Sequence, residues 1–200
     1  NWFHKLHQKF IFKNADALTL KFAPEDIPHR DNEINIIAQI LAPSLKNIKP
    51  SNIFIYGKPG TGKTLVVKNV LNSMKEISNK RNIPLKSIYL NCKLQNVSDT
   101  EYRILAQLAR EFGRNIPSTG LPTNEVYNEF TQALNESSKL IILVLDEIDV
   151  LVKKCGDNIL YNLTRINENL KDSSITIVGI SNDVNFKNNL EPRVKSSLGE

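Results

Sequence analysis

Hydrophobic residues follow two alternating patterns along this chain. Short continuous apolar runs at residues 52–56, 87–92, 140–145 and 175–180 predict four buried strands. Between them, apolar residues recur every three or four positions, which predicts helices at residues 33–45, 63–79, 99–112, 123–136 and 158–170. Strands that alternate with helices form a parallel sheet covered on both faces. The pattern therefore predicts an α/β fold, a three-layer αβα sandwich around a parallel sheet.

The first predicted helix carries its own boundary signals. Asp31 is a candidate N-cap for the helix at 33–45, because its side chain can accept hydrogen bonds from the first turn. Pro43 lacks a backbone N–H, so we expect it to bend or shorten this helix. Upstream, Pro24 and Pro28 disfavour a continuous helix, and the segment 22–30 is expected to be extended.

Composition limits the class of protein but does not identify it. Two hundred residues suffice for one α/β domain, and the 40% hydrophobic and 24% charged fractions are those of an ordinary globular chain. No apolar run approaches the ~20 residues of a membrane span, so we expect no membrane partner. Cys92 and Cys155 are too few for a disulfide framework, which favours reduced thiols in the cytoplasm. The net charge of +5 is compatible with a polyanionic partner without requiring one.

The strongest chemical signal follows the first predicted strand. Residues 57–64 match the pattern G-x-x-x-x-G-K-[ST], and a predicted helix begins at once behind them. Glycines let successive backbone N–H groups turn toward one anion, and the helix adds its positive dipole end. Lys63 is expected to reach the β- and γ-phosphates of a bound nucleotide, and the Thr64 hydroxyl to ligate Mg²⁺. The residues expected around the nucleotide are Gly57, Lys58, Pro59, Gly60, Thr61, Gly62, Lys63, Thr64 and Leu65.

A pair of acids ends the third predicted strand. Asp146 and Glu147 follow a continuous apolar run, which puts both at the carboxyl edge of the sheet, where ligands bind in such folds. We expect Asp146 to hold Mg²⁺, directly or through a water molecule. Glu147 is expected to polarise the attacking water as general base.

Asn182 lies just after the fourth predicted strand. An uncharged amide at a strand tip can hydrogen-bond a γ-phosphate or orient a water molecule without competing for the metal. Asn is also a common turn residue, so this signal depends on the two motifs that precede it.

These three motifs, in this order, resemble Walker A, Walker B and sensor 1 of the AAA+ ATPases. Further blocks resemble the archaeal origin-recognition and cell-division-control replication initiators, and the resemblance covers nearly the whole chain, from about residue 10. These blocks are residues 27–30, 41–45, 50–57, 119–123, 146–149 and 192–198.

The resemblance implies a slow, Mg²⁺-dependent ATPase that acts as a replication initiator in the cytoplasm, at the nucleoid. Its implied partners are double-stranded origin DNA, the replicative helicase and another initiator subunit, with ATP and ADP as the switch. Ile27, Pro28 and Arg30 would then lie against the adenine, and Arg193 would act in trans on a neighbour's γ-phosphate. The strand order of the family places the fourth strand between the phosphate-loop strand and the acid-pair strand, which would aim Asn182 into the gap between Lys63 and Asp146.

The resemblance also implies a DNA-contacting helical insertion after the second strand. Its counterpart here is the helix near 99–112, and the candidate phosphate contacts are Lys93, Arg103, Arg110 and Arg114. The alternative is that these basic residues form an ordinary solvated helix face.

Two further expectations concern the extent of the chain and its class. We expect residues 1–30 to form an N-terminal extension with an adenine-side segment, and residues 31–200 to form an AAA+ base subdomain whose lid and winged-helix domains lie outside this stretch. The alternative functions are a clamp-loader-like or motor ATPase, in which turnover is fast, and a signalling ATPase that does not bind DNA.

Overall fold

The computed structural model describes residues 27–93, 100–137 and 139–197. Four parallel strands form one sheet in the order β1-β4-β3-β2. They are β1 (Ile53–Tyr56), β2 (Leu85–Asn91), β3 (Leu140–Asp146) and β4 (Ser174–Ser181). The predicted position of the fourth strand, between the phosphate-loop strand and the acid-pair strand, is confirmed.

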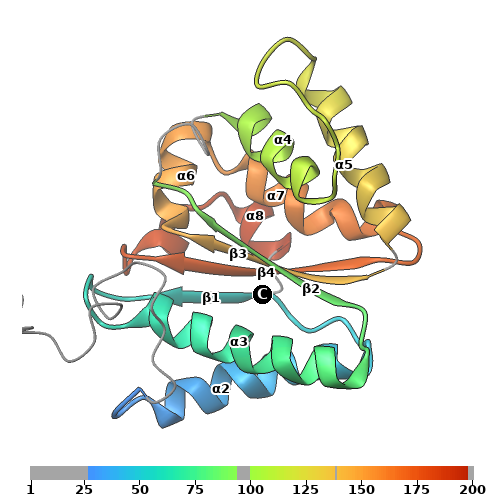
Figure 1. The fold of residues 1–200 in the computed structure, drawn as a ribbon. Coiled ribbons are helices and arrows are strands. Elements are labelled where there is room, and N and C mark those ends of the chain that lie inside the picture. Colours follow the sequence, from blue (N-terminus) through green and yellow to red (C-terminus); the bar gives the residue numbers. More distant parts are fainter. Residues whose placement is uncertain (1–26, 94–99, 138, 198–200) are drawn as a thin grey trace, which may run out of the picture.

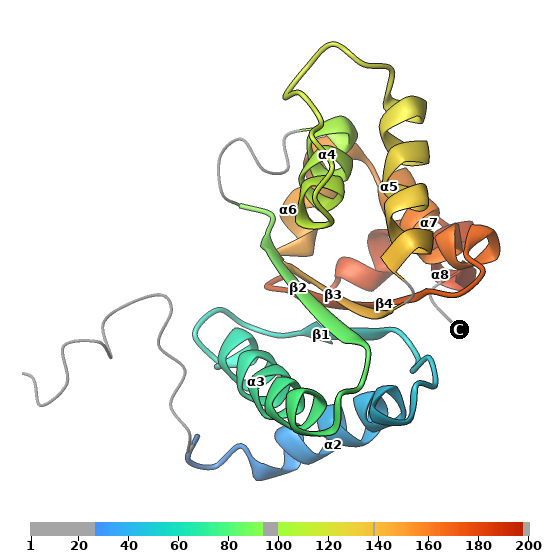
Figure 2. The same cartoon turned by 45° about the vertical axis from the view of Figure 1, so that its right-hand side comes forward.

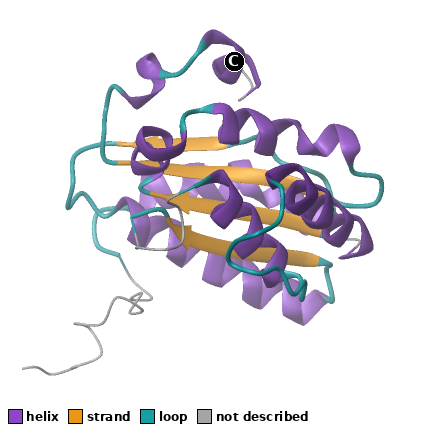
Figure 3. Cartoon of the chain, turned by 90° about the horizontal axis from the view of Figure 1, so that it is seen from above, coloured by secondary structure: helices purple, strands orange, loops and turns teal. Residues whose placement is uncertain are grey.

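Helices cover both faces of this sheet (Figures 1 and 2). One face is covered by α2 (Asp31–Leu41) and α3 (Lys63–Arg81). The other is covered by α4 (Glu101–Glu111), α5 (Thr123–Ser137), α6 (Ile148–Cys155), α7 (Asn158–Arg165) and α8 (Pro192–Ser197). Figure 3 looks onto this second face, with the strands side by side and helices in front of and behind them. The predicted three-layer α/β sandwich is confirmed.

Alternation along the strands divides the core into two layers. Odd-numbered β3 residues such as Leu143 and Leu145 face α4 to α8, whereas even-numbered ones such as Ile142 and Val144 face α2 and α3. Every residue of β3 is buried, because this strand is paired on both sides and covered on both faces. Asp146 has the even parity of Ile142 and Val144, so it continues the face that looks toward α3.

The core layer on the face covered by α4 to α8 closes tightly where β1 meets β4. Gly179 pairs in register with Phe54. A Cβ atom at Gly179 would lie 2.6 and 2.7 Å from two carbons of the Phe54 ring and 3.0 Å from Ile148 Cδ1. Glycine is therefore required here by the packing of β1 and α6 against β4.

Two local expectations need correction, and one is confirmed. Asp31 is not the N-cap, because α2 already begins at Asp31 after Arg30, and no side chain caps it; its carboxylate lies in the first turn, near the positive helix end. The α-helix ends at Leu41, and a 3₁₀ segment, Ala42–Lys46, continues it past Pro43, so the helix is shortened as expected. The helix expected at 158–170 is an α-helix only to Arg165 and continues as a 3₁₀ segment, Ile166–Asn169.

Three short helical segments were missed by the periodicity: α6, α8 and a 3₁₀ turn at Phe186–Asn189. Among the described residues, no helix is both long and apolar enough to span a membrane.

Candidate functional site

The carboxyl ends of all four strands meet at one edge of the sheet. Tyr56 pairs with Ser181, and Asp146 lies in register with both Ile180 and Asn91. This register brings together the starts of the phosphate loop, the acid pair and the β4 tip that carries Asn182. Motifs that lie far apart in the sequence thus share one site; Thr64 and Asp146, for example, are 82 residues apart.

The glycine loop has the backbone geometry that its sequence predicts. Gly60 and Gly62 have φ angles of +78° and +85°, a region that side chains rarely adopt, and α3 begins directly at Lys63. Lys63 Nζ donates hydrogen bonds to the carbonyl oxygens of Gly57, at 2.8 Å, and Lys58, at 2.9 Å. The ammonium group therefore lies across the loop, beside the N-terminus of α3, where phosphate oxygens are favoured by charge and by the helix dipole.

Thr64 and Asp146 lie together, as the metal assignment requires. Thr64 Oγ1 donates to Asp146 Oδ2 at 2.9 Å. Hydroxyl and carboxylate oxygens are hard donors that suit Mg²⁺, so the residues present fit this ion. Among the described residues, no group of three or more His, Cys, Asp or Glu side chains is placed to hold a metal. The ion would therefore depend on phosphate and water oxygens for most of its ligands.

In the part of the chain that the structure describes, the Asp146 carboxylate has two further hydrogen-bond donors. The Tyr89 hydroxyl donates to Oδ2 at 2.5 Å, and the backbone N–H of Glu147 donates to Oδ1 at 3.0 Å. Burial of the phenol, and then its hydrogen bond to Asp146, raise the pKa of Tyr89 well above its usual range, which keeps the hydroxyl protonated as a donor.

Glu147 has a left-handed backbone, with φ of +55°, and is the residue from which α6 starts. Its side chain is 21% exposed, and its Oε2 lies 3.6 Å from Lys93 Nζ in the turn after β2. The left-handed conformation turns Glu147 out of the direction of β3 while Asp146 stays in register. The two adjacent acids are thereby separated, which their distinct expected roles require.

Asp149 fastens the end of β4. This buried carboxylate accepts hydrogen bonds through Oδ1 from Ser181 Oγ, at 3.0 Å, and from the backbone N–H of Asn182, at 3.2 Å. It belongs to the first turn of α6, so the helix that follows the acid pair also fixes the neighbouring strand tip. The half-buried Asn182 is held there by its backbone.

The expected adenine-side segment lies beside the same end of the molecule. Ile27 is half-buried and packs against the core layer that contains α2 and α3. Arg30 Nη1 bonds Glu33 Oε1 at 2.6 Å in the first turn of α2. The first turns of α2 and α3 lie on the same side of the sheet (Figure 1). The rest of the expected extension, residues 1–26, lies outside the described residues.

Arg193 lies elsewhere. Its Nε bonds Glu191 Oε2 at 2.7 Å and its Nη2 bonds Asn158 Oδ1 at 2.6 Å, while the guanidinium lies 5.6 Å from the centre of the Tyr161 ring. It thus contacts α7, on the face of the sheet opposite to α3 (Figure 1). The structure does not bring Arg193 together with the phosphate loop.

The basic residues expected to contact DNA divide into different environments. Arg110 donates from Nε and Nη2 to the Ile116 carbonyl oxygen, and Arg114 pairs with Glu136 at 2.8 Å. Both stabilise the connection between α4 and α5, so we do not retain them as phosphate contacts.

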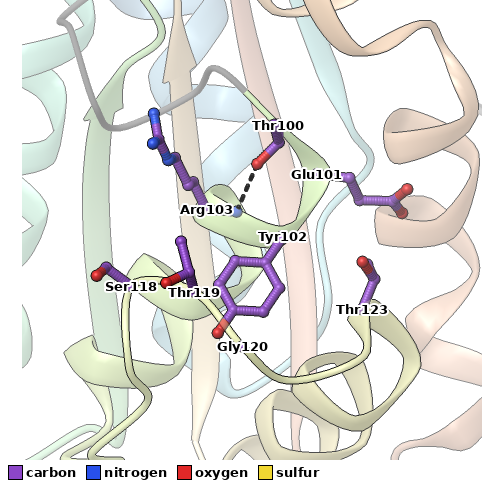
Figure 4. A pocket seen from close by; sticks show the side chains of 8 residues that line it. All are labelled: Thr100, Glu101, Tyr102, Arg103, Ser118, Thr119, Gly120 and Thr123. Carbon is purple, nitrogen blue, oxygen red and sulfur yellow. Dashed lines mark hydrogen bonds between the residues drawn. The ribbon is translucent and has the colours of Figure 1, made fainter.

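Arg103 instead lines an open hollow of about 510 Å³ at the N-terminal ends of α4 and α5 (Figure 4). Thr100 caps α4 there by accepting from the Arg103 N–H at 3.3 Å. The remaining lining is rich in hydroxyl groups and consists of Glu101, Tyr102, Ser118, Thr119, Gly120 and Thr123.

Tyr89 and Asp149 were missed as site residues. Tyr89 precedes Asn91 by two positions, and Asn91 pairs with Asp146, so Tyr89 lies on the face of Asp146; the sequence alone did not reveal this register. Asp149 follows Asp146 by three residues in D-E-I-D, which is the spacing of a first helical turn, but the short α6 gave no periodicity to show it.

Comparison with known proteins shows which family this chain matches. The family model described as "AAA domain" matches residues 48–184. The ORC1-type DNA replication protein of Pyrococcus furiosus is 50% identical over 199 residues, which is 98% of this chain and 47% of that protein. ORC1-type DNA replication protein 1 of Archaeoglobus fulgidus is 50% identical over 190 residues, covering 95% of this chain and 46% of that protein.

Solved structures of related proteins support the same family. The Aeropyrum pernix ORC1 protein, solved in complex with DNA, matches with a TM-score of 0.85 and 40% identity, over 94% of this chain and 48% of that one. Cdc6p from Pyrobaculum aerophilum matches with a TM-score of 0.74 at 22% identity, a likeness in fold alone. This chain spans about half the length of the curated relatives that it matches. With its phosphate loop, acid pair and sheet order, the chain belongs to the AAA domain family and is similar to about half of an archaeal ORC1-type replication protein.

Proposed function

We propose that this chain is the ATPase portion of a replication initiator that binds double-stranded origin DNA and takes part in helicase loading, with ATP and ADP as the switch. The observation that carries the nucleotide part is the convergence of Lys63, Thr64 and Asp146 at one sheet edge. The DNA part is supported by similarity to a relative solved with DNA, at 40% identity.

The phosphates of the nucleotide would be held by the backbone N–H groups of the loop and by Lys63. When a nucleotide binds, Lys63 Nζ would give up its hydrogen bonds to the carbonyl oxygens of Gly57 and Lys58 and donate to phosphate oxygens instead. These charge-assisted hydrogen bonds are stronger. Thr64 and Asp146 would hold Mg²⁺, which when bound neutralises phosphate charge. Ile27, Pro28 and Arg30 would contact the base.

Hydrolysis would depend on Glu147 and Asn182. Glu147 takes a proton from the attacking water, and the amide of Asn182 hydrogen-bonds the γ-phosphate or that water. Alternation along β4 supports this, because Asn182 continues the parity of Val178 and Ile180, which face α3. Arg193, exposed on α8, would serve a nucleotide on a neighbouring subunit.

The hollow around Arg103 is the surface that we assign to DNA. Arginine, threonine and serine side chains and helix N-termini are common partners of the phosphate backbone, which they contact without reading its sequence. Lys93, 71% exposed, lies in the turn that leads from β2 toward this region.

The nucleotide assignment is tested by titrating a fluorescent ATP analogue into Lys63→Ala. Hydrogen bonds to charged groups contribute about 1.5–3 kcal/mol, so affinity should fall about 10–100-fold. Lys75→Ala is the matched control, because Lys75 is an exposed lysine of the same helix. Equal affinities in the two variants would contradict the assignment.

The DNA assignment is tested by fluorescence anisotropy with duplex DNA over a series of salt concentrations. Loss of one phosphate contact in Arg103→Ala should weaken binding and lower the salt slope by about one. Lys80→Ala, in the last turn of α3 on the other face of the sheet, should behave like the unaltered protein. Absence of salt-dependent binding in the unaltered protein would favour a signalling ATPase, and rapid steady-state turnover would favour a clamp-loader-like enzyme.

A further inference from the structure

Tyr89 is a partly exposed residue on an edge strand, yet its side chain reaches into the proposed metal site. Among the described strands, β2 pairs with β3 alone, and Tyr89 is 36% exposed. A surface tyrosine ordinarily turns its hydroxyl to solvent. Here the hydroxyl points inward and ends 2.5 Å from Asp146 Oδ2.

The register of the sheet explains how this contact forms. Tyr89 pairs with Val144, and Asn91 pairs with Asp146. Tyr89 is thus diagonal to Asp146 on the same face, a separation that a long side chain can span. Lys68 Nζ lies 4.6 Å from the centre of the Tyr89 ring. Lys68 is one helical turn beyond Thr64 on α3, so α3 holds the ring while β3 receives its hydroxyl.

The hydrogen bonds of Asp146 show what the contact does. A carboxylate offers about four lone-pair positions, two on each oxygen. Thr64 and Tyr89 both donate to Oδ2, and the Glu147 N–H donates to Oδ1. Among the described residues, three donors, from α3, from β2 and from the residue that follows β3, fix the carboxylate plane, and one position on Oδ1 is left for the ion or its water.

We propose that Tyr89 is a positioning residue for the metal site, which acts on Mg²⁺ only through Asp146. This inference rests on the proposed function, since it takes Asp146 as the carboxylate that holds the ion. Groups that hydrogen-bond a metal ligand typically contribute about 10–100-fold in metal affinity. Because Tyr89 is one of three donors, we expect a contribution of about 10-fold.

The test is Tyr89→Phe, which removes one oxygen atom and keeps the ring over which Lys68 lies. Affinity for a fluorescent ATP analogue is measured against free Mg²⁺ concentration and in EDTA, and Mn²⁺ binding is read directly by electron paramagnetic resonance with the nucleotide present. We expect the Mg²⁺ midpoint and the Mn²⁺ dissociation constant to rise about 10-fold, with affinity in EDTA changed less than twofold. Tyr127→Phe is the matched control, because Tyr127 is a half-buried tyrosine of α5, on the face of the sheet opposite to α3.

A double-mutant cycle separates positioning from a general structural role. In an Asp146→Asn background, Tyr89→Phe should alter the metal dependence less than twofold, because the path through the carboxylate is already altered. An unchanged Mg²⁺ midpoint in Tyr89→Phe, an equal loss in EDTA, or additive effects in the double variant would each overturn the inference. If the unaltered protein showed no metal dependence, the proposed metal site itself would fail, which is a different result.

Discussion

Gly179→Ala tests the packing that joins β4 to β1 and α6. The added Cβ would lie 2.6 and 2.7 Å from the Phe54 ring, about 1 Å inside the ordinary contact distance of about 3.5–4.0 Å. Overpacking a core typically costs about 1–3 kcal/mol, and two ring contacts together with Ile148 put this site in the upper part of that range. Alanine also reduces the entropy of the unfolded chain, which returns about 0.4–1 kcal/mol. We expect a net loss of about 1–2 kcal/mol.

The measurement is urea and thermal unfolding without nucleotide. For a chain of this length, each kcal/mol lowers the melting temperature by about 2–4 °C, so a decrease of about 2–8 °C is expected. Gly57→Ala is the control, because its Cβ would meet Lys63 Cδ and Thr61 Oγ1 only at 3.8 Å. If Phe54 is the obstacle, the cost of Gly179→Ala should fall by at least half in a Phe54→Leu background. Equal stability of the Gly179→Ala and Gly57→Ala variants would refute the reasoning.

Three further predictions concern the site. In the full-length protein, Glu147→Gln should leave nucleotide binding intact and slow single-turnover hydrolysis by about 10²–10⁴-fold; a loss below tenfold would contradict a general base. Asn182→Ala should reduce the hydrolysis rate by a larger factor than the affinity for ATP, because its hydrogen bond strengthens as charge develops; the same two assays decide this. Burial, followed by the Asp146 charge, raises the pKa of Cys92 to about 12, so iodoacetamide at pH 8 should modify Cys155 and spare Cys92 until the protein unfolds, as read by mass spectrometry. The stability that this shift contributes is fully present below about pH 8.5 and is lost as the pH rises toward 12.

The sequence predicted the parts of the fold that depend on local pattern. β3 is apolar at six consecutive positions because it is central and covered twice, and that environment leaves a clear signal. The glycine loop was also predictable, since Gly60 and Gly62 are needed for backbone angles that other residues avoid. Both features are determined by residues that adjoin in the chain.

Contacts between side chains on different strands were harder to predict from the sequence. The Tyr89 hydroxyl meets Asp146 only because β2 and β3 pair in one particular register, which no local pattern in β2 reveals. In the sequence, Arg110 and Arg114 looked like part of a basic DNA-binding face. In the structure, Arg110 instead bonds a carbonyl oxygen of the loop after α4, and Arg114 pairs with an acid of α5. Charge alone does not distinguish a residue that binds a partner from one that holds a loop.

The alignment of the site by strand register has a consequence for insertions and deletions. Asp146 lies level with Ile180 and Asn91 through hydrogen bonds of the sheet, not through the connecting loops. Adding residues in the connection 117–122, between α4 and α5, would leave these positions where they are. Adding one residue within β3 would turn every following side chain to the opposite face, so that Asp146 would face the core beside α6. Changes in length should therefore leave nucleotide binding intact in that connection and should abolish it within the strands.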